Sequence, residues 1–136
     1  MSGPMGDPRA LMEAARAVRE RAYAPYSSFA VGAAVEDDRG RVYVGCNVEN
    51  ASHPAGICAE RAAVAAAIAD GARRLRALAV FGSSQEPTMP CGICRQVLIE
   101  FGDPVIYAGG LGGTIRESRA RELLPHHFGP EMLGAP

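Results

Sequence analysis

Two cysteines stand three positions apart, directly after a proline, in the segment PTMPCGICRQ at residues 87–96. They are Cys91 and Cys94, and the chain of 136 residues has two other cysteines, Cys46 and Cys58. A C-x-x-C pair can be half of a metal site, a redox dithiol, or two small apolar residues at the start of a helix. Which of these applies depends on the residues that the rest of the chain brings to the pair.

Three of the four cysteines fall at the predicted starts of helices. Cys58 opens the alanine-rich segment 58–71, and Cys91 and Cys94 lie in the first turn of segment 91–102. Each predicted helix follows a predicted strand, so neighbouring strands of one sheet could bring both helix N-termini, which stabilise thiolates, to the same edge. Three converging thiolates favour one zinc ion per chain. Three protein ligands leave the fourth tetrahedral position open, as in catalytic zinc sites.

Glu60 is the informative residue beside these cysteines. It lies two positions after Cys58, too close to be an independent ligand but well placed beside the open position of the ion. A carboxylate there can accept a proton from a water molecule and hand it on, acting as general base and then as general acid. The combination of C-A-E at 58–60 with P-C-x-x-C at 90–94 is the pattern of zinc deaminases, in which the glutamate is not a ligand.

Two arginines are placed to moderate the charge of such a site. Three thiolates on a dication leave a net negative charge, which would weaken the pull of the ion on a water molecule. Arg61 lies one helical turn after Cys58, and Arg95 follows Cys94. Guanidinium groups that donate hydrogen bonds to the sulfurs would withdraw negative charge and restore the acidity of the water.

Composition and charge limit the classes of function. The length favours one domain, residues 1–136, and a net charge of −1 without a basic stripe argues against a nucleic-acid polymer as partner. The longest apolar run, 62–69, is far shorter than the roughly 20 residues of a membrane-spanning helix. No secretory signal is recognisable at the N-terminus, so a cytoplasmic protein with reduced thiols is expected. All fourteen basic residues are arginine, which excludes a lysine Schiff base.

Helical and strand patterns alternate along the chain. A helix is expected from Pro8, capped by Asp7, and two strands at 29–37 and 41–49 would form a hairpin. After these come, in order, a helix at 58–71, a strand at 75–82, a helix at 91–102, strands at 104–109 and 113–118, and a short helix at 119–125. This alternation predicts an α/β fold with a largely parallel sheet covered by helices and preceded by an antiparallel hairpin.

The chain resembles the cytidine deaminase family, in the short form that assembles as a homotetramer. The segments FAVGAAV, NVENAS, ICAERAA, PCGICRQVLIEF and ELLPHHFGP are similar to that family's segments, in its order, and together cover most of residues 20–130. The resemblance implies a three-layer α/β/α fold with a mixed central sheet of about five strands. It also implies hydrolytic deamination of cytidine and 2′-deoxycytidine to uridine and 2′-deoxyuridine with release of ammonia, as in pyrimidine salvage.

The resemblance assigns a role to each residue of the predicted zinc site. Cys58, Cys91 and Cys94 would be the zinc ligands. Glu60 would be the catalytic residue that shuttles protons while an ion-activated water attacks C4 of the base. Of the two arginines, the resemblance favours Arg61 as the donor to the ligand sulfurs.

The residues that the resemblance assigns to substrate binding come from four segments of the chain: Phe29, Asn47, Glu49, Ala59 and Phe128. Asn47 and Glu49 would hold the ribose hydroxyls, and Phe29 would form part of the pocket wall. Phe128 would reach from a C-terminal tail, about residues 124–136, into the pocket of a neighbouring subunit, so that the tetramer shares its active sites.

Some positions depart from the family or stay outside the site. His53 and Pro54 stand where the family usually has tyrosine and glycine, so the loop before Cys58 is expected to differ. Cys46 is expected to be a packed core residue rather than a ligand. The three histidines are expected to be solvated rather than bound to zinc: His53, His126 and His127.

Three alternatives remain open on the residues alone. A dithiol redox protein would use Cys91 and Cys94 but leaves Cys58 and Glu60 unexplained, and the chain lacks a tryptophan before the pair. A zinc-stabilised binding module would have an incomplete ligand set, because closed structural sites normally have four protein ligands. A deaminase of another aminated ring, such as blasticidin S or a guanine-type base, would have less use for residues that hold ribose.

Overall fold

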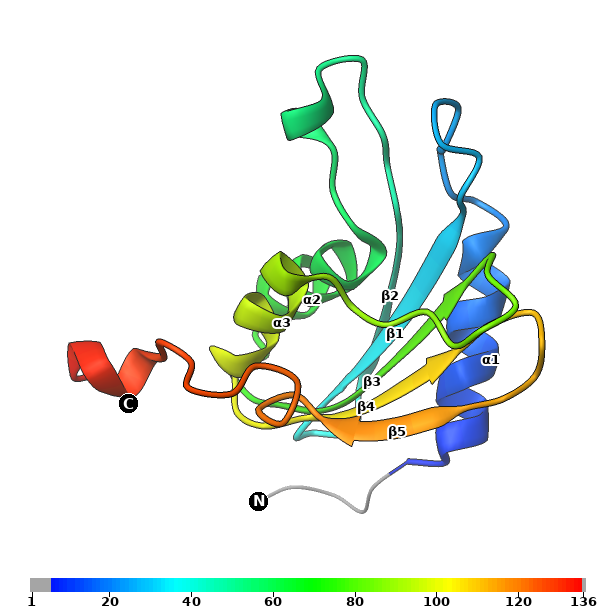
Figure 1. Ribbon diagram of the computed structural model, residues 1–136. Coiled ribbons are helices and arrows are strands. Elements are labelled where there is room, and N and C mark those ends of the chain that lie inside the picture. The colour runs from blue at the N-terminus through cyan, green and yellow to red at the C-terminus, as the bar shows by residue number, and fades with distance from the viewer. Residues whose placement is uncertain (1–5, 136) are drawn as a thin grey trace.

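The computed structural model describes residues 6–135; residues 1–5 and 136, which the single-domain prediction includes, lie outside the described residues. Within residues 6–135, five strands form one sheet in the order β2-β1-β3-β4-β5 (Figure 1). The strands are β1 (Val31–Asp37), β2 (Val42–Cys46), β3 (Leu75–Gly82), β4 (Val105–Gly109) and β5 (Arg116–Arg119). Strands β3 and β4 pair in parallel and the other neighbours pair antiparallel, so the sheet is mixed, as the family resemblance implies. The largely parallel sheet expected from the alternation of elements is wrong, because β1 lies antiparallel between β2 and β3 and β5 returns antiparallel to β4.

Helices cover both faces of this sheet. Helix α1 (Pro8–Arg19) lies on one face, and α2 (Ala59–Ala69) and α3 (Gly92–Ile99) lie on the other (Figure 1). The alternation of side chains along β3 makes both layers possible, because Ala79 and Phe81 pack with α1 while Leu78 and Val80 pack in the core beneath α2 and α3. The predicted three-layer α/β/α fold is therefore confirmed. None of the helices described is long and apolar enough to cross a bilayer.

The connections place both helices of the second layer with their N-termini at one edge of the sheet. Strands β2 and β3 both run antiparallel to β1, which lies between them, so β2 and β3 point the same way. Helix α2 connects β2 to β3, and α3 connects β3 to β4, so each helix begins beyond the carboxyl end of a strand in the same direction. This is the arrangement that the sequence predicted for the two cysteine-bearing helix starts.

Local signals in the sequence set the ends of the helices. The Asp7 carboxylate accepts a hydrogen bond from the Arg9 backbone N–H at 3.0 Å, which caps α1 directly before Pro8. After α2 the chain turns at Gly71 with a φ of +99°, and after α3 it turns at Gly102 with a φ of +118°. These left-handed conformations favour glycine, so both helices end where expected.

Gly45 lets α2 approach the sheet closely. A Cβ atom at this position of β2 would lie 2.4 Å from the Ala63 backbone nitrogen and 2.7 Å from the Ala59 carbonyl oxygen, both in α2. Real carbon atoms do not approach so closely, so any larger residue would push α2 away from β2. The depth of α2, and with it the position of Cys58 at its start, therefore depends on a residue without a side chain.

The predicted helix at 119–125 is wrong. Residues 120–126 form turns, and only two 3-10 helices are described, η1 (His53–Ala55) and η2 (Pro130–Leu133). The backbone N–H of Ala120 donates to the Pro104 carbonyl at 3.0 Å, and that of Arg121 donates to the Asp103 carboxylate at 2.9 Å. These hydrogen bonds to the segment before β4 take the place of the helical hydrogen bonds that the local sequence favoured.

Asp37 organises the turn between β1 and β2. Its buried carboxylate accepts hydrogen bonds from the backbone N–H groups of Arg39 and Arg41 and forms an ion pair with the Arg39 guanidinium at 2.7 Å. Burial acts to raise the pKa of Asp37, but the hydrogen bonds from Arg41 and Arg39 outweigh it and lower the pKa. The stability that this group contributes is thus present above the unfolded-state pKa of about 3.9 and is lost as pH falls through the lower folded-state pKa.

We expect Asp37→Asn to lower the free energy of unfolding at pH 7 by about 1–3 kcal/mol, because a buried charged acceptor is lost. Urea titrations of parent and variant measure this difference, which should shrink on acidification below about pH 4 as the parent carboxylate is protonated. Asp38→Asn is the matched control, since the described structure shows no hydrogen bond to the Asp38 side chain. Equal stabilities of parent and Asp37→Asn at pH 7 would contradict the prediction.

Candidate metal centre

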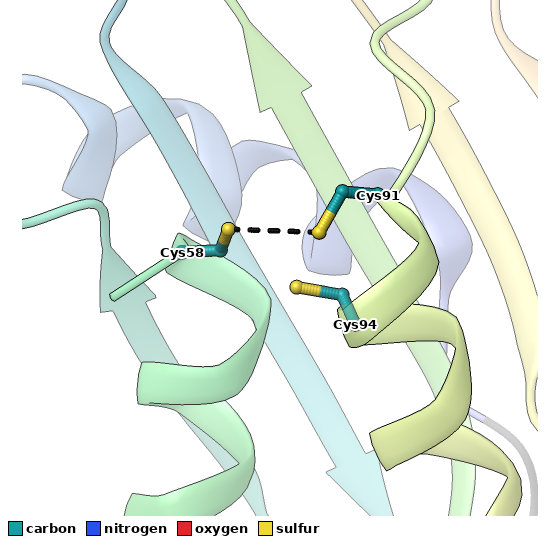
Figure 2. Close-up of side chains that lie close together, drawn as sticks. All are labelled: Cys58, Cys91 and Cys94. Carbon is teal, nitrogen blue, oxygen red and sulfur yellow. Dashed lines mark hydrogen bonds between the residues drawn. The ribbon is translucent and has the colours of Figure 1, made fainter. Parts of the chain in front are cut away.

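Three sulfur atoms meet where α2 and α3 begin. Cys58 is the N-cap residue of α2, Cys91 is the N-cap residue of α3, and Cys94 lies in the first turn of α3. The close-up in Figure 2 shows their side chains pointing toward one another across the gap between the two helices. The Sγ atoms of Cys58 and Cys91 are 3.8 Å apart, and all three Sγ atoms lie within 4.8 Å of one another. The sequence-predicted ligands are therefore brought together.

The spacing of these sulfurs fits one tetrahedral zinc ion. Thiolates bound to zinc at about 2.3 Å stand about 3.8 Å apart in tetrahedral geometry. Cys94 is buried, Cys58 is partly buried and Cys91 is exposed, so the cluster is closed on one side and open on the other. Within residues 6–135, this cluster of potential metal ligands consists of cysteines alone and includes neither Cys46 nor a histidine. Three soft donors with one open side suit a zinc ion with a fourth position for water.

Arg61 is the arginine that contacts the sulfurs. Its Nη2 atom donates to Sγ of Cys58 at 3.5 Å, while its Nε atom is buried without a hydrogen-bond partner in the described structure. A hydrogen bond from the Cys94 thiol, and then the one from Arg61, lower the pKa of Cys58 despite its partial burial. The site thus favours a thiolate at Cys58, which is the protonation state a metal ligand needs.

Arg95 does not contact a sulfur. Its Nε atom donates to the Pro90 carbonyl at 2.8 Å, and its Nη1 atom donates to the Leu123 carbonyl at 2.9 Å. The suggestion that Arg95 moderates the charge of the site is therefore wrong, because its side chain turns back along the segment before Cys91. It fixes that segment against the chain that follows β5.

Glu60 is buried beside the sulfur cluster, with 4% of its surface exposed. Burial raises the pKa of Glu60 to about 7, and the negative charge of Cys58 adds a smaller contribution in the same direction. Glu60 lines a cavity of about 250 Å³ together with Cys58 and Cys91. A proton-accepting group therefore faces the same space as the open side of the ligand set.

Four of the five predicted substrate-binding residues line this cavity as well. They are Phe29, Asn47, Glu49 and Ala59. A second cavity of about 380 Å³ shares Asn47, Glu49 and Cys58 with the first and extends toward Arg61. The two adjoining spaces provide a partly apolar pocket with a few polar groups, which is typical of a small-molecule site.

Asn47 and Glu49 are already engaged with the loop that precedes β1. The Asn47 amide accepts from the Val31 backbone N–H at 2.8 Å and donates to the Phe29 carbonyl at 2.8 Å. The Glu49 carboxylate accepts from the backbone and hydroxyl of Ser27, and these hydrogen bonds, the hydroxyl's above all, lower its pKa. An amide and a carboxylate each retain further hydrogen-bonding capacity for a ligand.

Comparison with known proteins accounts for this constellation. Residues 5–109 match the family model described as "Cytidine and deoxycytidylate deaminase zinc-binding region". A cytidine deaminase of Sporosarcina psychrophila is 43% identical over 129 residues, which cover 93% of this chain and 95% of that protein. A second relative, from Halalkalibacterium halodurans, is 44% identical over 129 residues, which cover 93% of this chain and 98% of that protein. The chain belongs to the cytidine deaminase family.

Solved structures of cytidine deaminases have the same fold. The enzyme from Burkholderia pseudomallei superimposes with a TM-score of 0.87 at 47% identity, covering 90% of this chain and 100% of that one. The enzyme from Mycobacterium tuberculosis superimposes with a TM-score of 0.80 at 44% identity, covering 92% of this chain and 99% of that one. The mixed sheet and its three helices thus match the fold of these two cytidine deaminases.

Phe128 is the predicted residue that this cytidine deaminase-family chain does not bring to its own cavity. Its side chain is 57% exposed, and neither of the two adjoining cavities includes it. The contact of Phe128 with the pocket of a second subunit therefore stays a prediction. His53 lines the larger cavity and packs edge-to-face on Tyr26 with ring centroids 5.7 Å apart.

Four residues that line the cavity beside Glu60 were not assigned a role from the sequence. They are Ser27, Val31, Thr88 and Met89. Ser27 and Val31 flank Phe29 at two residues on either side, and Thr88 and Met89 come shortly before Cys91, so closeness to assigned residues is the available signal. Their residue types carry no signal for binding, because serine and threonine are common on protein surfaces and valine and methionine are common in cores.

Proposed function

We propose that this chain is a zinc-dependent hydrolase that converts cytidine and 2′-deoxycytidine to uridine and 2′-deoxyuridine and releases ammonia. The observation that carries the proposal is that the Sγ atoms of Cys58, Cys91 and Cys94 lie within 4.8 Å of one another, beside the buried Glu60 and at the cavity that it lines. Relatives that are named cytidine deaminases and align over more than nine-tenths of the chain support the choice of substrate.

The chemistry needs proton transfers that Glu60 is placed to perform. A zinc ion held by the three cysteines supplies a Lewis acid that makes water acidic enough to attack near neutral pH. Glu60 accepts one proton from the attacking water and delivers it to N3 of the cytosine as C4 becomes tetrahedral. It then accepts the remaining proton of the oxygen added at C4 and passes it to the amine, so that the C4 carbonyl forms as ammonia leaves. Because Glu60 is buried, its pKa is raised to about 7, so the carboxyl group can both accept and donate a proton near neutral pH.

The remaining cavity residues orient the nucleoside. Asn47 and Glu49 offer an amide and an ionised carboxylate to the ribose hydroxyls, and their existing hydrogen bonds hold both side chains in place. Phe29 and Ala59 supply the apolar wall for the base. Phe29 lies on the loop before β1, to which Asn47 is hydrogen-bonded, and Ala59 is the first residue of α2. A site that hydrogen-bonds a sugar discriminates strongly against bases that lack one.

We expect Arg61→Ala to lower kcat for cytidine by about 10–100-fold, the range for loss of an outer partner of a metal ligand. The physical reason is that Cys58 would keep more negative charge and water would be less acidified, while the nucleoside contacts remain. Steady-state kinetics should therefore show a larger change in kcat than in KM.

Arg61→Lys is the conservative control, since it retains the charge and should recover part of the turnover. Normal turnover in Arg61→Ala would remove the charge-moderating role.

We propose a homotetramer with shared active sites in the cytoplasm, acting in pyrimidine salvage. Phe128, Met132 and Leu133 are 57%, 59% and 76% exposed, and such a group of apolar side chains supports contact with another subunit. Thiol ligands favour a reducing compartment. Size-exclusion chromatography with light scattering measures the number of subunits.

The test is metal analysis coupled to turnover. The purified protein should contain about one zinc per chain. It should also lower the ultraviolet absorbance of cytidine as ammonia is released. Cytosine, blasticidin S and guanine serve as comparison substrates, because a site built for ribose should favour the nucleosides. A protein that holds zinc but prefers one of these rings would be a deaminase of another substrate, and metal-free protein that reduces disulfides would be a redox protein.

A further inference from the structure

The C-terminal arm, residues 124–135, is held by contacts that the proposed reaction does not use. Figure 1 shows this segment leaving β5, passing the end of α3 and projecting away from the sheet. Its apolar side chains, among them Phe128 and Leu133, are exposed in the single chain. An arm with exposed apolar residues would ordinarily sample many positions, so the contacts that hold it bear on whatever the arm does.

Arg121 connects the arm to the carboxyl end of α3. Its Nη2 atom donates at 3.3 Å to the Ile99 carbonyl, one of those that the last turn of α3 leaves free. Its Nε atom donates at 3.4 Å to the carbonyl of Gly102, in the turn that follows the helix. The same guanidinium reaches the arm, with Nη1 at 3.4 Å from Oε1 of Glu131. One side chain thus bridges the metal-bearing helix and the arm.

His127 completes the contact from the arm. Its Nε2 atom lies 2.9 Å from Nη1 of Arg121 and 3.0 Å from Oε1 of Glu131, and its side chain is 17% exposed. Neutral His127 with a bare Nε2 accepts from Arg121, and His127 with a proton on Nε2 donates to Glu131. The network keeps a partner for His127 in either state, so the expectation that this histidine is solvated is wrong.

Phe128 sits directly beside this network. On the other side its backbone carbonyl accepts a hydrogen bond from Nε2 of Gln96 at 2.7 Å, and Gln96 lies in the middle of α3. Phe128 is thus fixed to α3 through Gln96 and through the neighbouring His127. Its side chain remains 57% exposed, so the contacts that fix this residue leave most of the ring available.

We infer that Arg121, His127 and Glu131 form a clasp that positions Phe128 for contact with the nucleoside site of a second copy of this chain. The inference rests on the proposed function and on the assembly proposed with it. The clasp is composed of positioning residues, since none of them lines the cavity beside Glu60. It orders the arm before association, so less conformational freedom is lost when the subunits meet.

The first test measures the order of the arm without reference to activity. Limited digestion with chymotrypsin, which cuts after residues such as Phe128 and Leu133, should be about threefold to tenfold faster in His127→Ala and in Glu131→Ala than in the parent. His127→Gln should be digested like the parent, because one amide supplies both an acceptor for Arg121 and a donor for Glu131. His126→Asn is the matched control: His126 has a φ of +54°, which asparagine tolerates, and it takes no part in the clasp.

The second test measures substrate binding. His127→Ala should raise KM for cytidine by about threefold to tenfold and change kcat by less than about twofold, since a misplaced wall residue weakens ground state and transition state alike. Phe128→Ala should do the same. In the Phe128→Ala background, His127→Ala should add nothing further, because both changes remove one interaction.

Specific outcomes would overturn the inference. Parent-like digestion of His127→Ala would show that there is no clasp, and equal effects of His126→Asn and His127→Ala would show that the contacts are not specific. Faster digestion with unchanged KM would separate the clasp from substrate binding and refute its positioning role. If the parent itself had no deaminase activity, the proposed function would fail while the digestion series still decided whether the clasp exists.

Discussion

Glu60→Gln should keep about one zinc per chain and lose turnover of cytidine by about 10²–10⁴-fold, the usual contribution of a general acid–base group. The substitution preserves the shape of a side chain that is 4% exposed, so the packing at the start of α2 should not change. The amide cannot accept the proton that water loses, nor hand one to the leaving amine. Metal analysis and steady-state kinetics on the same preparation measure both quantities.

Glu100→Gln provides the matched control for this variant. Glu100 is also a glutamate at the end of a helix, since it is the C-cap residue of α3. Its side chain is exposed, and it lies at the end of α3 that is far from the sulfurs. It should retain both zinc and turnover. Turnover of Glu60→Gln within tenfold of the parent would contradict the shuttle role, and so would loss of zinc together with activity.

Cys58→Ser should lose both bound zinc and turnover, with a fall in activity larger than the roughly 10–100-fold that outer partners of a metal ligand typically cost. Cys58 is the one sulfur of the cluster that comes from α2, so its removal leaves only the two that α3 supplies. A neutral hydroxyl is a poor replacement for a thiolate on zinc. Zinc content by elemental analysis and the rate of cytidine deamination check the result.

The same variant separates the deaminase from the dithiol alternative. A redox protein that works through Cys91 and Cys94 would be indifferent to Cys58→Ser and would still reduce disulfides. Cys46→Ser is the control on thiol chemistry in general, because Cys46 lies on β2 outside the sulfur cluster and should keep zinc and activity. Full zinc occupancy in Cys58→Ser would remove the three-sulfur site.

The sequence was sufficient to predict the elements that position the sulfurs. Cys58 and Cys91 could be placed at helix starts because the alanine-rich run and the C-x-x-C segment each follow a strand pattern and end at a glycine. Those signals are local, and local signals survive into the fold when the tertiary contacts agree with them. The convergence of the two helix starts follows from the common direction of β2 and β3, which alternation of elements predicts. The insertion of β1 between them, antiparallel to both, was not predicted.

The directions of long side chains could not be predicted in the same way. Arg61 follows Cys58 by three residues and Arg95 follows Cys91 by four, about one helical turn in each case, yet Arg61 contacts a sulfur and Arg95 turns to the Pro90 carbonyl. Arginine has several rotatable bonds, so nearby acceptors decide its conformation. The contacts of His127 depend on residues that come together only when the arm passes α3, and a single sequence carries no signal for them.

The sheet order also bears on when the site can form during folding. Cys58 and Cys91 are separated by 33 positions, and that stretch contains α2 and the whole of β3, which must insert between β1 and β4 before the two helix starts become neighbours. In an unfolded chain only Cys91 and Cys94 are close together. Bringing the sulfur of Cys58 to them is opposed by the entropy of closing the loop between residues 58 and 91. We therefore expect tight metal uptake to follow the pairing of the central strand β3, because only then does the third sulfur lie beside the other two.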